Sequence, residues 1–504
     1  MCVWSVSEAF ISLWLHDEPL GYSPAAGPRI SVKVDYKQRE NYAGLDPYTF
    51  STGRQWNFSW LSYVRLDING HPVVHFPGGK ESTFYTSQDY LTNTRLTGNT
   101  NSGFTVTDPS GSQDTYGLIV TNSLGRFVKA FLTRRQNASG QPITFNYYVN
   151  TNAVTPVVRL QTVVDGDGRT NTVYYVVANS YSTNLISYVV DPFNRTNSFN
   201  YDSSGHLTNI VDVQGIQSSF AYSQDLVTNL TTPYGTTSFS VVDSMLPDGR
   251  SVLITQPDGG HLLYLYTNGA PGMSNSYPSG SVPNTYPFAN TLDNAELNVR
   301  NTFYWGPRQY ANLSTTTISS FTTADFLKAR MKHWLKEDNF IDTIAPTLSM
   351  EREPSPDAAG AIEGQKTWYD YAGKTGAQYQ GRQILPLLVG RVLPDGTTWF
   401  TRTDRNPLGM VTTNVSTYSI SGTVFLRTNI YAYSSDGTDL LTVTNALGIQ
   451  TSSNVFNAYH QVATNYNAIG EVTTYTYNAN HQATSTTHPC SAKLILRESW
   501  IGIG

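Results

Sequence analysis

The strongest constraint on the fold is a recurring four-residue spacing, with Asp or Asn at the first position and Gly at the fourth. The first side chain bonds the backbone two residues on, and the glycine takes the left-handed conformation that ends a tight turn. Such a turn closes a β-hairpin with a short loop. Ten copies begin at Asp67, Asp108, Asn122, Asn137, Asp165, Asp191, Asp202, Asp212, Asn445 and Asn467, with Asn194 in the glycine position of the copy at Asp191. The spacing predicts an array of β-hairpins, and arrays are more often scaffolds or containers than catalysts.

The composition supports a β-rich chain. Of 504 residues, only 14% are charged while 12% are aromatic, including 33 Tyr. Few charges and many Tyr, Thr and Val suit half-buried pleated surfaces better than helices. The net charge is −5 and no basic patch stands out, so nucleic acid is not an expected partner. Two cysteines at opposite ends, Cys2 and Cys490, exclude a disulfide framework.

The clearest repeat lies at residues 191–222. Phe199 and Tyr201 recur 21 residues later as Phe220 and Tyr222, so one unit holds two strands and two turns. The same unit returns between residues 445 and 478. The residues that carry this signature are Tyr201, Asp202, Gly205, Leu207, Asp212, Gly215, Phe220, Tyr222, Asn445, Gly448, Asn467, Gly470, Tyr475 and Tyr477. Two strands in about 20 residues favour a continuous strip of sheet, although two units would also make one propeller blade of about 40–50 residues.

These patterns divide the chain into five segments. Residues 1–107 form an aromatic N-terminal segment in which Trp56, Phe58 and Trp60 alternate on one face and a hairpin follows, with its turn at Gly70. Hairpin repeats fill residues 108–265 and return at 396–489. Between them, residues 266–395 form an irregular insertion rich in Pro and Gly near 271–287. Residues 490–504 lack the pattern and form an atypical tail, either a genuine terminus or the product of a frameshift.

One helix is predicted inside the insertion, over about residues 322–339. Thr322 and Asp325 resemble a capping box. Leu327, Met331, Trp334 and Leu335 then follow with the spacing of one helix face, and lysines occupy the opposite face. This pattern predicts a helix packed by one stripe on a sheet.

No motif for catalysis or cofactor binding is present. The segment from His75 to Ser82 fails the phosphate-loop pattern, and HExxH, GxSxG and paired-cysteine spacings are absent. Asp165 and Asp167 offer two carboxylates for calcium, but an EF-hand needs further oxygen ligands, so a turn is the favoured interpretation. His16 with Asp17, and His71 with His75, are interpreted as surface polar residues. We therefore expect no catalytic residue, no metal and no cofactor.

The repeat units resemble the YD repeat of RHS-repeat proteins, the family that includes the shells of insecticidal toxin complexes and of teneurins. Tyr201, Asp202, Gly205, Leu207, Asp212, Gly215 and Tyr222 match the form YDxxGxLxxxxDxxGxxxxxxY. The resemblance covers roughly residues 30–265 and 395–489. It implies an all-β strip of antiparallel hairpins that spirals into a partial hollow cage, here with one inserted α-helix. In that family the shell encloses a polypeptide, often a toxin.

Many members of the family also cleave themselves at an aspartate-based site around DPxGL. The nearest text here runs from Asp404 to Met410, where Asp and Pro are not adjacent, and it is interpreted as a turn with an inserted residue. No variable toxin domain is visible. The resemblance therefore implies a piece of the shell that lacks both the self-cleavage site and the toxin domain.

Three functions remain open at this point. The first is a non-enzymatic shell segment, secreted or at the cell surface, whose partners are an enclosed polypeptide or the rest of a longer RHS protein. The second is a scaffold that binds carbohydrate or protein through exposed Tyr and Trp. The third, a propeller-type glycosidase, needs two close carboxylates with shifted pKa values in a cleft. The resemblance, not a leader sequence, supports a location outside the cell, and we expect no membrane span because the chain has no run of 18 apolar residues.

Overall fold

The fold is seen in a computed structural model that describes residues 1–39, 46, 48–151, 156–176, 184–243, 249–283, 287–337 and 344–488, and the backbone of 493–495. The structure is nearly all β and its strands pair antiparallel, which confirms the predicted fold class. Two small sheets come from the N-terminal part. One holds β1 (Val3–Ser7), β2 (Ser12–Tyr22), β3 (Ile30–Lys37) and β4 (Trp56–Phe58); the other holds β5 (Tyr63–Leu66), β6 (Pro72–His75), β7 (Glu81–Thr83), β12 (Leu118–Thr121) and β13 (Phe127–Phe131).

All other strands form one long strip in which each strand pairs with the next one along the sheet. Its first part, called the first coil, holds β8 (Gln88–Asp89), β9 (Thr94–Asn99), β10 (Gly103–Thr107), β11 (Gln113–Tyr116), β14 (Arg134–Gln136), β15 (Pro142–Asn150), β16 (Val157–Val164), β17 (Thr170–Tyr175), β18 (Ile186–Val190), β19 (Thr196–Tyr201), β20 (Leu207–Val211), β21 (Gln217–Ser223), β22 (Leu226–Thr232), β23 (Gly235–Val242), β24 (Ser251–Thr255), β25 (His261–Thr267), β26 (Asn301–Trp305), β27 (Arg330–Lys336), β28 (Ile344–Arg352), β29 (Lys366–Asp370) and β30 (Leu388–Val392). The second coil holds β31 (Thr398–Arg405), β32 (Val411–Ile420), β33 (Thr423–Tyr433), β34 (Leu440–Thr444), β35 (Gln450–Phe456), β36 (Val462–Asn467), β37 (Val472–Tyr477), β38 (Ala483–Thr487) and β39 (Lys493–Ile495). Across the described residues no ladder joins β39 to β8, so the strip has two ends.

The predicted turns close the hairpins. In each of the ten, the backbone N–H of the fourth residue donates to the carbonyl of the first, and the N–H of the first donates to the carbonyl of the fifth. In the turn at Asp202 both of these distances are 3.1 Å, and Gly205 has a φ of 83°. Asn194 takes the same conformation with a φ of 60°. The left-handed fourth residue, which glycine adopts without strain, is therefore common to all ten turns.

The same turn also forms at positions where the sequence analysis did not predict it. Asn406 and Gly409 make it without an extra residue, so the expectation of an inserted residue near Asp404 was wrong: Asn406 occupies the first position. Two further copies end in His460 and His481, whose φ values are 57° and 63°.

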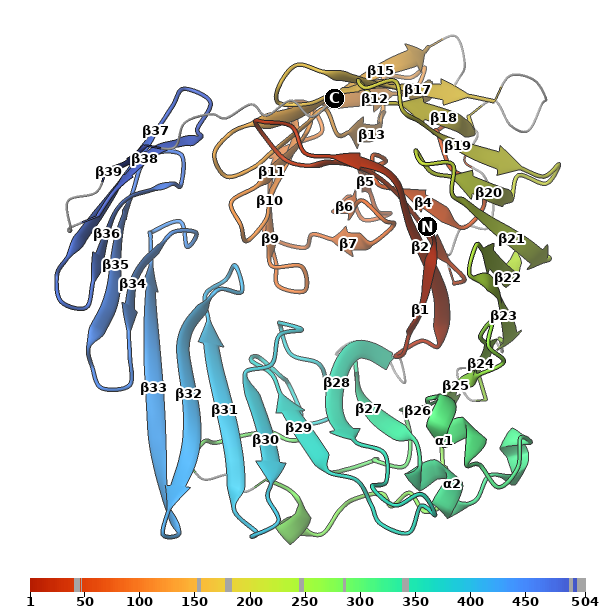
Figure 1. The fold of residues 1–504 in the computed structure, drawn as a ribbon, viewed down its shortest axis with the longest axis vertical. Helices are drawn as coiled ribbons and strands as arrows, with labels where there is room; N and C mark the ends of the chain where they lie inside the picture. Colours follow the sequence, from red (N-terminus) through yellow and green to blue (C-terminus); the bar gives the residue numbers. More distant parts are fainter. Residues whose placement is uncertain are drawn as a thin grey trace.

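The two faces of the strip carry different cores. In β25, Leu262 and Tyr266 join the core shared with the N-terminal sheets, while Leu263 and Leu265 join the core shared with the insertion. The N-terminal sheets thus cover the inner face of the first coil, and the insertion covers part of its outer face (Figure 1). The insertion also contains η1 (Ser279–Ser281), α1 (Pro307–Ala311), η2 (Ile318–Ser320) and α2 (Thr323–Leu327).

The long helix predicted over 322–339 was wrong beyond its first turn. The capping box of Thr322 and Asp325 forms, but α2 ends at Leu327 and Arg330–Lys336 is strand β27. The register of β27 shifts between His333 and Trp334 and again between Trp334 and Lys336. Met331 packs in the core shared with the insertion and Trp334 in the core shared with the N-terminal sheets, and Leu335 is also buried. A bulged strand buried on both faces thus reproduces the spacing of a helix face.

The strip curves until the second coil meets the first, turn against turn (Figure 1). Gln88 Nε2 donates to the Pro407 carbonyl and Arg95 Nη2 to the Asp436 carbonyl, each at 3.2 Å. Further along, Gln141 Nε2 donates to the carbonyl of Asn480. The contacts advance in step along both coils, so the second coil lies on the first as in a spiral. We call this line of contacts the seam.

The five-segment division of the sequence stays a prediction. In the structure β8 to β10 pair into the strip, which therefore begins before residue 108. Of the atypical tail at 490–504, only the backbone of β39 is described, and it extends the strip by one strand beyond β38.

Candidate functional site

The signature tyrosines fasten the two strands of a hairpin together, because each one bonds across the turn to the start of the strand before it. The Tyr201 hydroxyl donates to the Ile186 carbonyl at 2.6 Å, and the Tyr222 hydroxyl donates to the Leu207 carbonyl at 2.7 Å. In both cases the carbonyl lies 15 residues back. The same bond, at the same separation, is made by Tyr147, Tyr175 and Tyr477. Burial raises the pKa of Tyr201 and Tyr222, so both phenols stay protonated and act as hydrogen-bond donors.

The remaining signature residues build the strip and do not converge on one site. Leu207 and Phe220 are buried in the inner core of the first coil. Asp202, Asp212, Asn445 and Asn467 begin turns, and Gly205, Gly215, Gly448 and Gly470 complete them. Tyr475 is half-buried on the second coil, beside Tyr477 on the same strand face. Their common role is structural.

The N-terminal sheets dock on this signature through buried polar contacts. Trp56 Nε1 donates to the Tyr222 hydroxyl at 2.9 Å, and the Trp56 ring lies 4.9 Å from that of Phe220. The Tyr36 hydroxyl donates to the Asp225 carbonyl and accepts from the Val227 N–H, both at 3.1 Å. The sequence marked Trp56 and Tyr222 separately, but no local pattern could pair residues 166 positions apart.

His206 is a contact that the sequence analysis missed. Its two ring nitrogens lie 2.8 Å from Asp202 Oδ2 and 2.8 Å from Asp225 Oδ1, and its ring stacks on Tyr222 at 4.7 Å. Asp225 also pairs with Arg54 at 3.4 Å. The only sequence signal was its position directly after the turn glycine, where the chain re-enters the strip.

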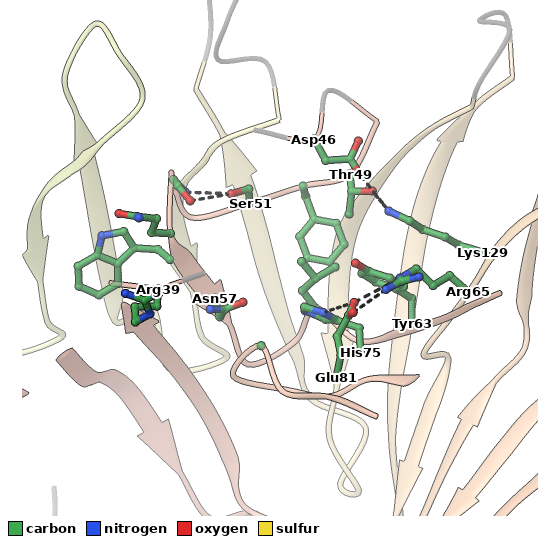
Figure 2. Close-up of a pocket in the computed structure, with 16 residues that line it drawn as sticks. Arg39, Asp46, Thr49, Ser51, Asn57, Tyr63, Arg65, His75, Glu81 and Lys129 are labelled. Carbon is green, nitrogen blue, oxygen red and sulfur yellow. Dashed lines mark hydrogen bonds and ion pairs between the residues drawn. The ribbon is translucent and has the colours of Figure 1, made fainter. Parts of the chain in front are cut away.

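One polar pocket of about 710 Å³ lies among the N-terminal sheets (Figure 2). On one wall Arg65 Nη2 lies 2.6 Å from Glu81 Oε2, and His75 Nδ1 lies 3.4 Å from Glu81 Oε1. On another, Lys129 Nζ donates to Asp46 Oδ2 at 2.8 Å and lies 4.3 Å from the Tyr63 ring centre. Tyr63 and His75 stack at 4.6 Å.

The carboxylates of this pocket are held in the ionised state. Burial alone would raise the pKa of Glu81, but hydrogen bonds from His75 and Arg65 outweigh it and lower that pKa to about 2. Burial would also raise the pKa of Asp46, but the nearby Lys129 ammonium outweighs burial and lowers that pKa. A general acid at neutral pH needs the opposite shift. The arrangement therefore offers charges for binding, and neither Glu81 nor Asp46 has the raised pKa of a general acid.

The other sequence candidates have structural partners. Asp165 accepts from the Tyr22 hydroxyl at 3.0 Å, and Asp167 accepts from the N–H groups of Ala25 and Ala26 at 2.8 and 3.0 Å. His16 lies 2.6 Å from Asp35, and His71 lies 3.1 Å from Asp67. Within the described ranges no three His, Cys, Asp or Glu side chains gather where a metal ion could bind. In the same part of the chain, no helix has both the length and the apolar character needed to cross a bilayer.

Comparison with known proteins supports the repeat. A model of the RHS Repeat family matches residues 201–237. A search of curated protein sequences finds no match. Solved structures of TcdB2-TccC3-TEV and of TcdB2-TccC3 without the hypervariable C-terminal region are each 10% identical. The first alignment covers 96% of this chain and 22% of that one with a TM-score of 0.28, and the second covers 96% and 28% with a TM-score of 0.18.

This chain therefore spans less than a third of the length of those chains. The family match falls on Tyr201, Asp202, Gly205, Asp212, Gly215 and Tyr222, the residues that define the hairpin turns and the tyrosine bonds. The chain carries an RHS repeat, and the predicted resemblance to the RHS-repeat proteins is confirmed.

Proposed function

We propose that this chain is a non-enzymatic segment of an RHS-type shell that encloses or presents a polypeptide outside the cell. The observation that supports it is the seam, where the second coil lies on the first and the strip curves back on itself. A strip that curves in this way separates an inner face from an outer one. A wall with two such faces suits a container.

The inner face differs between the two coils. Under the N-terminal sheets it is an apolar core, with Phe199, Ile210 and Phe220 buried. Positions that pair in the same register on the second coil carry Asn454, Asn465 and Tyr475, and all three are only half-buried. Much of the inner face of the second coil is thus available to an enclosed chain, and amide and hydroxyl groups there can bond a peptide backbone.

The free rim of the second coil supports a further partner, the remaining part of a longer RHS protein. The turns opposite the seam carry Leu447 and Ile469, which are 82% and 78% exposed. On the first coil, the corresponding turn at Asp212 is covered, because its Val213 donates its N–H to the Pro19 carbonyl of β2. Covering such turns with further chain follows the pattern that the first coil already shows.

The carbohydrate-binding alternative gains no support from the pocket. Trp56 is almost fully buried against Phe220, and the Tyr63 ring contacts both His75 and Lys129. A sugar that stacks on aromatic rings needs at least one free face. Trp56 and Tyr63 are thus engaged in the protein itself, and Phe50, the third aromatic side chain of the lining, is buried.

Protease protection tests the proposed function. An unstructured test polypeptide fused after Gly504 is compared with the same polypeptide inserted at the exposed turn beside Tyr234, which is 78% exposed. A shell segment protects the fused copy and leaves the inserted copy open to cleavage, so the two half-lives separate at least tenfold. Equal cleavage rates at both places would contradict an enclosing role.

A further inference from the structure

The strip has a step in its rim between β33 and β34. β34 pairs only with Ile430–Tyr433 of β33, from the Ile430–Thr444 pair to the Tyr433–Leu440 pair. Residues Thr423–Asn429 extend beyond it, about 24 Å of strand at 3.4 Å per residue. Each of these residues pairs with β32 on one side, from Thr423 with Ile420 to Asn429 with Asn414. Among the described residues no strand pairs with their other side (Figure 1).

This edge carries none of the usual protections against strand pairing. It contains no proline, and its only charged residue is Arg427. Phe425 is 41% and Leu426 50% exposed, and they lie on opposite faces of the strand. Free backbone groups flanked by exposed apolar side chains form a template for another strand.

We propose that this edge pairs with the same edge of a second copy of the chain. Antiparallel pairing about a two-fold axis at Leu426 uses the whole of Thr423–Asn429, because Leu426 is its central residue. Leu426 then faces Leu426, Val424 faces Thr428, and Phe425 faces Arg427. The pairing buries apolar side chains on one face and places a cation against an aromatic ring on the other.

The existing hairpin already shows that Arg427 suits this role. Its guanidinium lies 5.3 Å from the ring centre of Tyr418, and Tyr418 stacks on Phe425 at 5.5 Å. In the paired edges each Arg427 lies opposite a Phe425 and not opposite the other Arg427. Cross-strand pairs of this kind stabilise a ladder, whereas like charges directly opposite destabilise it. A strand of unrelated sequence has no such match, which favours a second copy as the occupant.

Sedimentation velocity of the full chain tests this proposal. The unmodified chain forms a concentration-dependent dimer between 1 and 100 µM. Leu426→Lys and Leu426→Glu each place like charges across the axis and raise the dissociation constant at least tenfold. An equimolar mixture of the two variants restores the dimer, since opposite charges then meet.

The matched control is Leu124→Lys at the exposed turn between β12 and β13, in a different sheet, which leaves the dimer unchanged. Circular dichroism confirms that each variant keeps its β content, as half-exposed positions allow. A chain that stays monomeric at 100 µM overturns the proposal, whether the edge then takes a strand from another protein or stays bare. So does a dimer that survives Leu426→Lys, or a mixture that fails to recover it.

Discussion

At the scale of single residues, the turn glycine fixes the backbone. Gly215 has a φ of 80°, and a Cβ added there would meet no atom within 4 Å. Any cost of Gly215→Ala is therefore conformational and not steric, and we expect a loss of about 1 kcal/mol of unfolding free energy. Gly280→Ala is the control, because it also meets nothing and lacks a positive φ. Urea unfolding midpoints report both, and equal midpoints would contradict the role of the left-handed position.

The tyrosine bond is the second residue-scale device. Tyr201→Phe removes one hydrogen bond to a buried carbonyl and should cost about 1 kcal/mol. Tyr222→Phe should cost about 2 kcal/mol, because it also leaves Trp56 Nε1 without its acceptor. The control is Tyr234→Phe, at a side chain that is 78% exposed. Urea denaturation ranks the three, and a Tyr222→Phe variant as stable as the Tyr234→Phe variant would contradict this assignment.

The turn glycine and the tyrosine hydrogen bond differ in how well the sequence alone predicts them. The Asp/Asn-x-x-Gly spacing predicts its own turns, because every group involved lies within five residues. The turns that end in His460 and His481 were not predicted, because a histidine in the fourth position does not signal the left-handed conformation as glycine does. The carbonyl that each tyrosine hydroxyl bonds was not predicted either, although the constant 15-residue separation could have been tested across copies of the repeat.

At the scale of elements, the insertion is fastened to the strip by a buried charged cluster. His333 is fully buried; its Nδ1 lies 3.0 Å from the Val299 carbonyl, and its Nε2 lies 3.6 Å from Asp293 Oδ2. Arg300 Nη2 approaches the same carboxylate oxygen at 3.6 Å. Burial lowers the pKa of His333; Asp293 opposes this shift and Arg300 adds to it. The folded protein therefore holds this imidazole neutral.

This cluster predicts local loosening in acid. Because the folded pKa of His333 lies below its unfolded value near 6.5, the unfolded state binds more protons as pH falls, and stability present above that value is lost below it. The protection factors for hydrogen exchange in β26 and β27, which correct for the slower intrinsic exchange in acid, should fall between pH 7.5 and 5.5. His333→Asn keeps an N–H donor near the Val299 carbonyl and should remove this local loss of protection, whereas His71→Asn, at an exposed site, should not. An unchanged profile in His333→Asn would contradict the assignment.

The helix expected over 322–339 shows where element prediction fails. Its capping box was correct, because capping is local and both side-chain bonds form. Its length was wrong, because a bulged strand that is buried on both faces has the apolar spacing of a helix. Periodicity alone cannot separate a bulged strand from a helix.

At the scale of the whole molecule, the seam joins residues that are far apart in the chain. Gln141 and Asn480 are 339 positions apart and bonded across it. A short bis-maleimide should link Gln141→Cys to Asn480→Cys within one molecule, in a background with Cys490→Ser. Gln141→Cys paired with Ala446→Cys, on the opposite rim, should not link. Mass spectrometry distinguishes them, and equal linking of both pairs would contradict the stacking.

The strip itself could be predicted from the repeat period, and its curvature could not. Each hairpin adds a small rotation that no single repeat reveals, and the seam depends on the sum over many strands. Because the repeat period does not reveal this rotation, the sequence alone could not exclude a propeller. The structure excludes it for the described residues, because the ladders of the strip continue from β8 to β38 without breaking into blades.

An electron cryo-microscopy map of the chain tests the central claim most directly. The account predicts one unbroken antiparallel strip that curls about an open interior, with the Asn406–Gly409 turn resting beside Asn93 of the first coil. A map in which the hairpins group into separate blades around an axis, or in which the second coil stands away from the first, would contradict it.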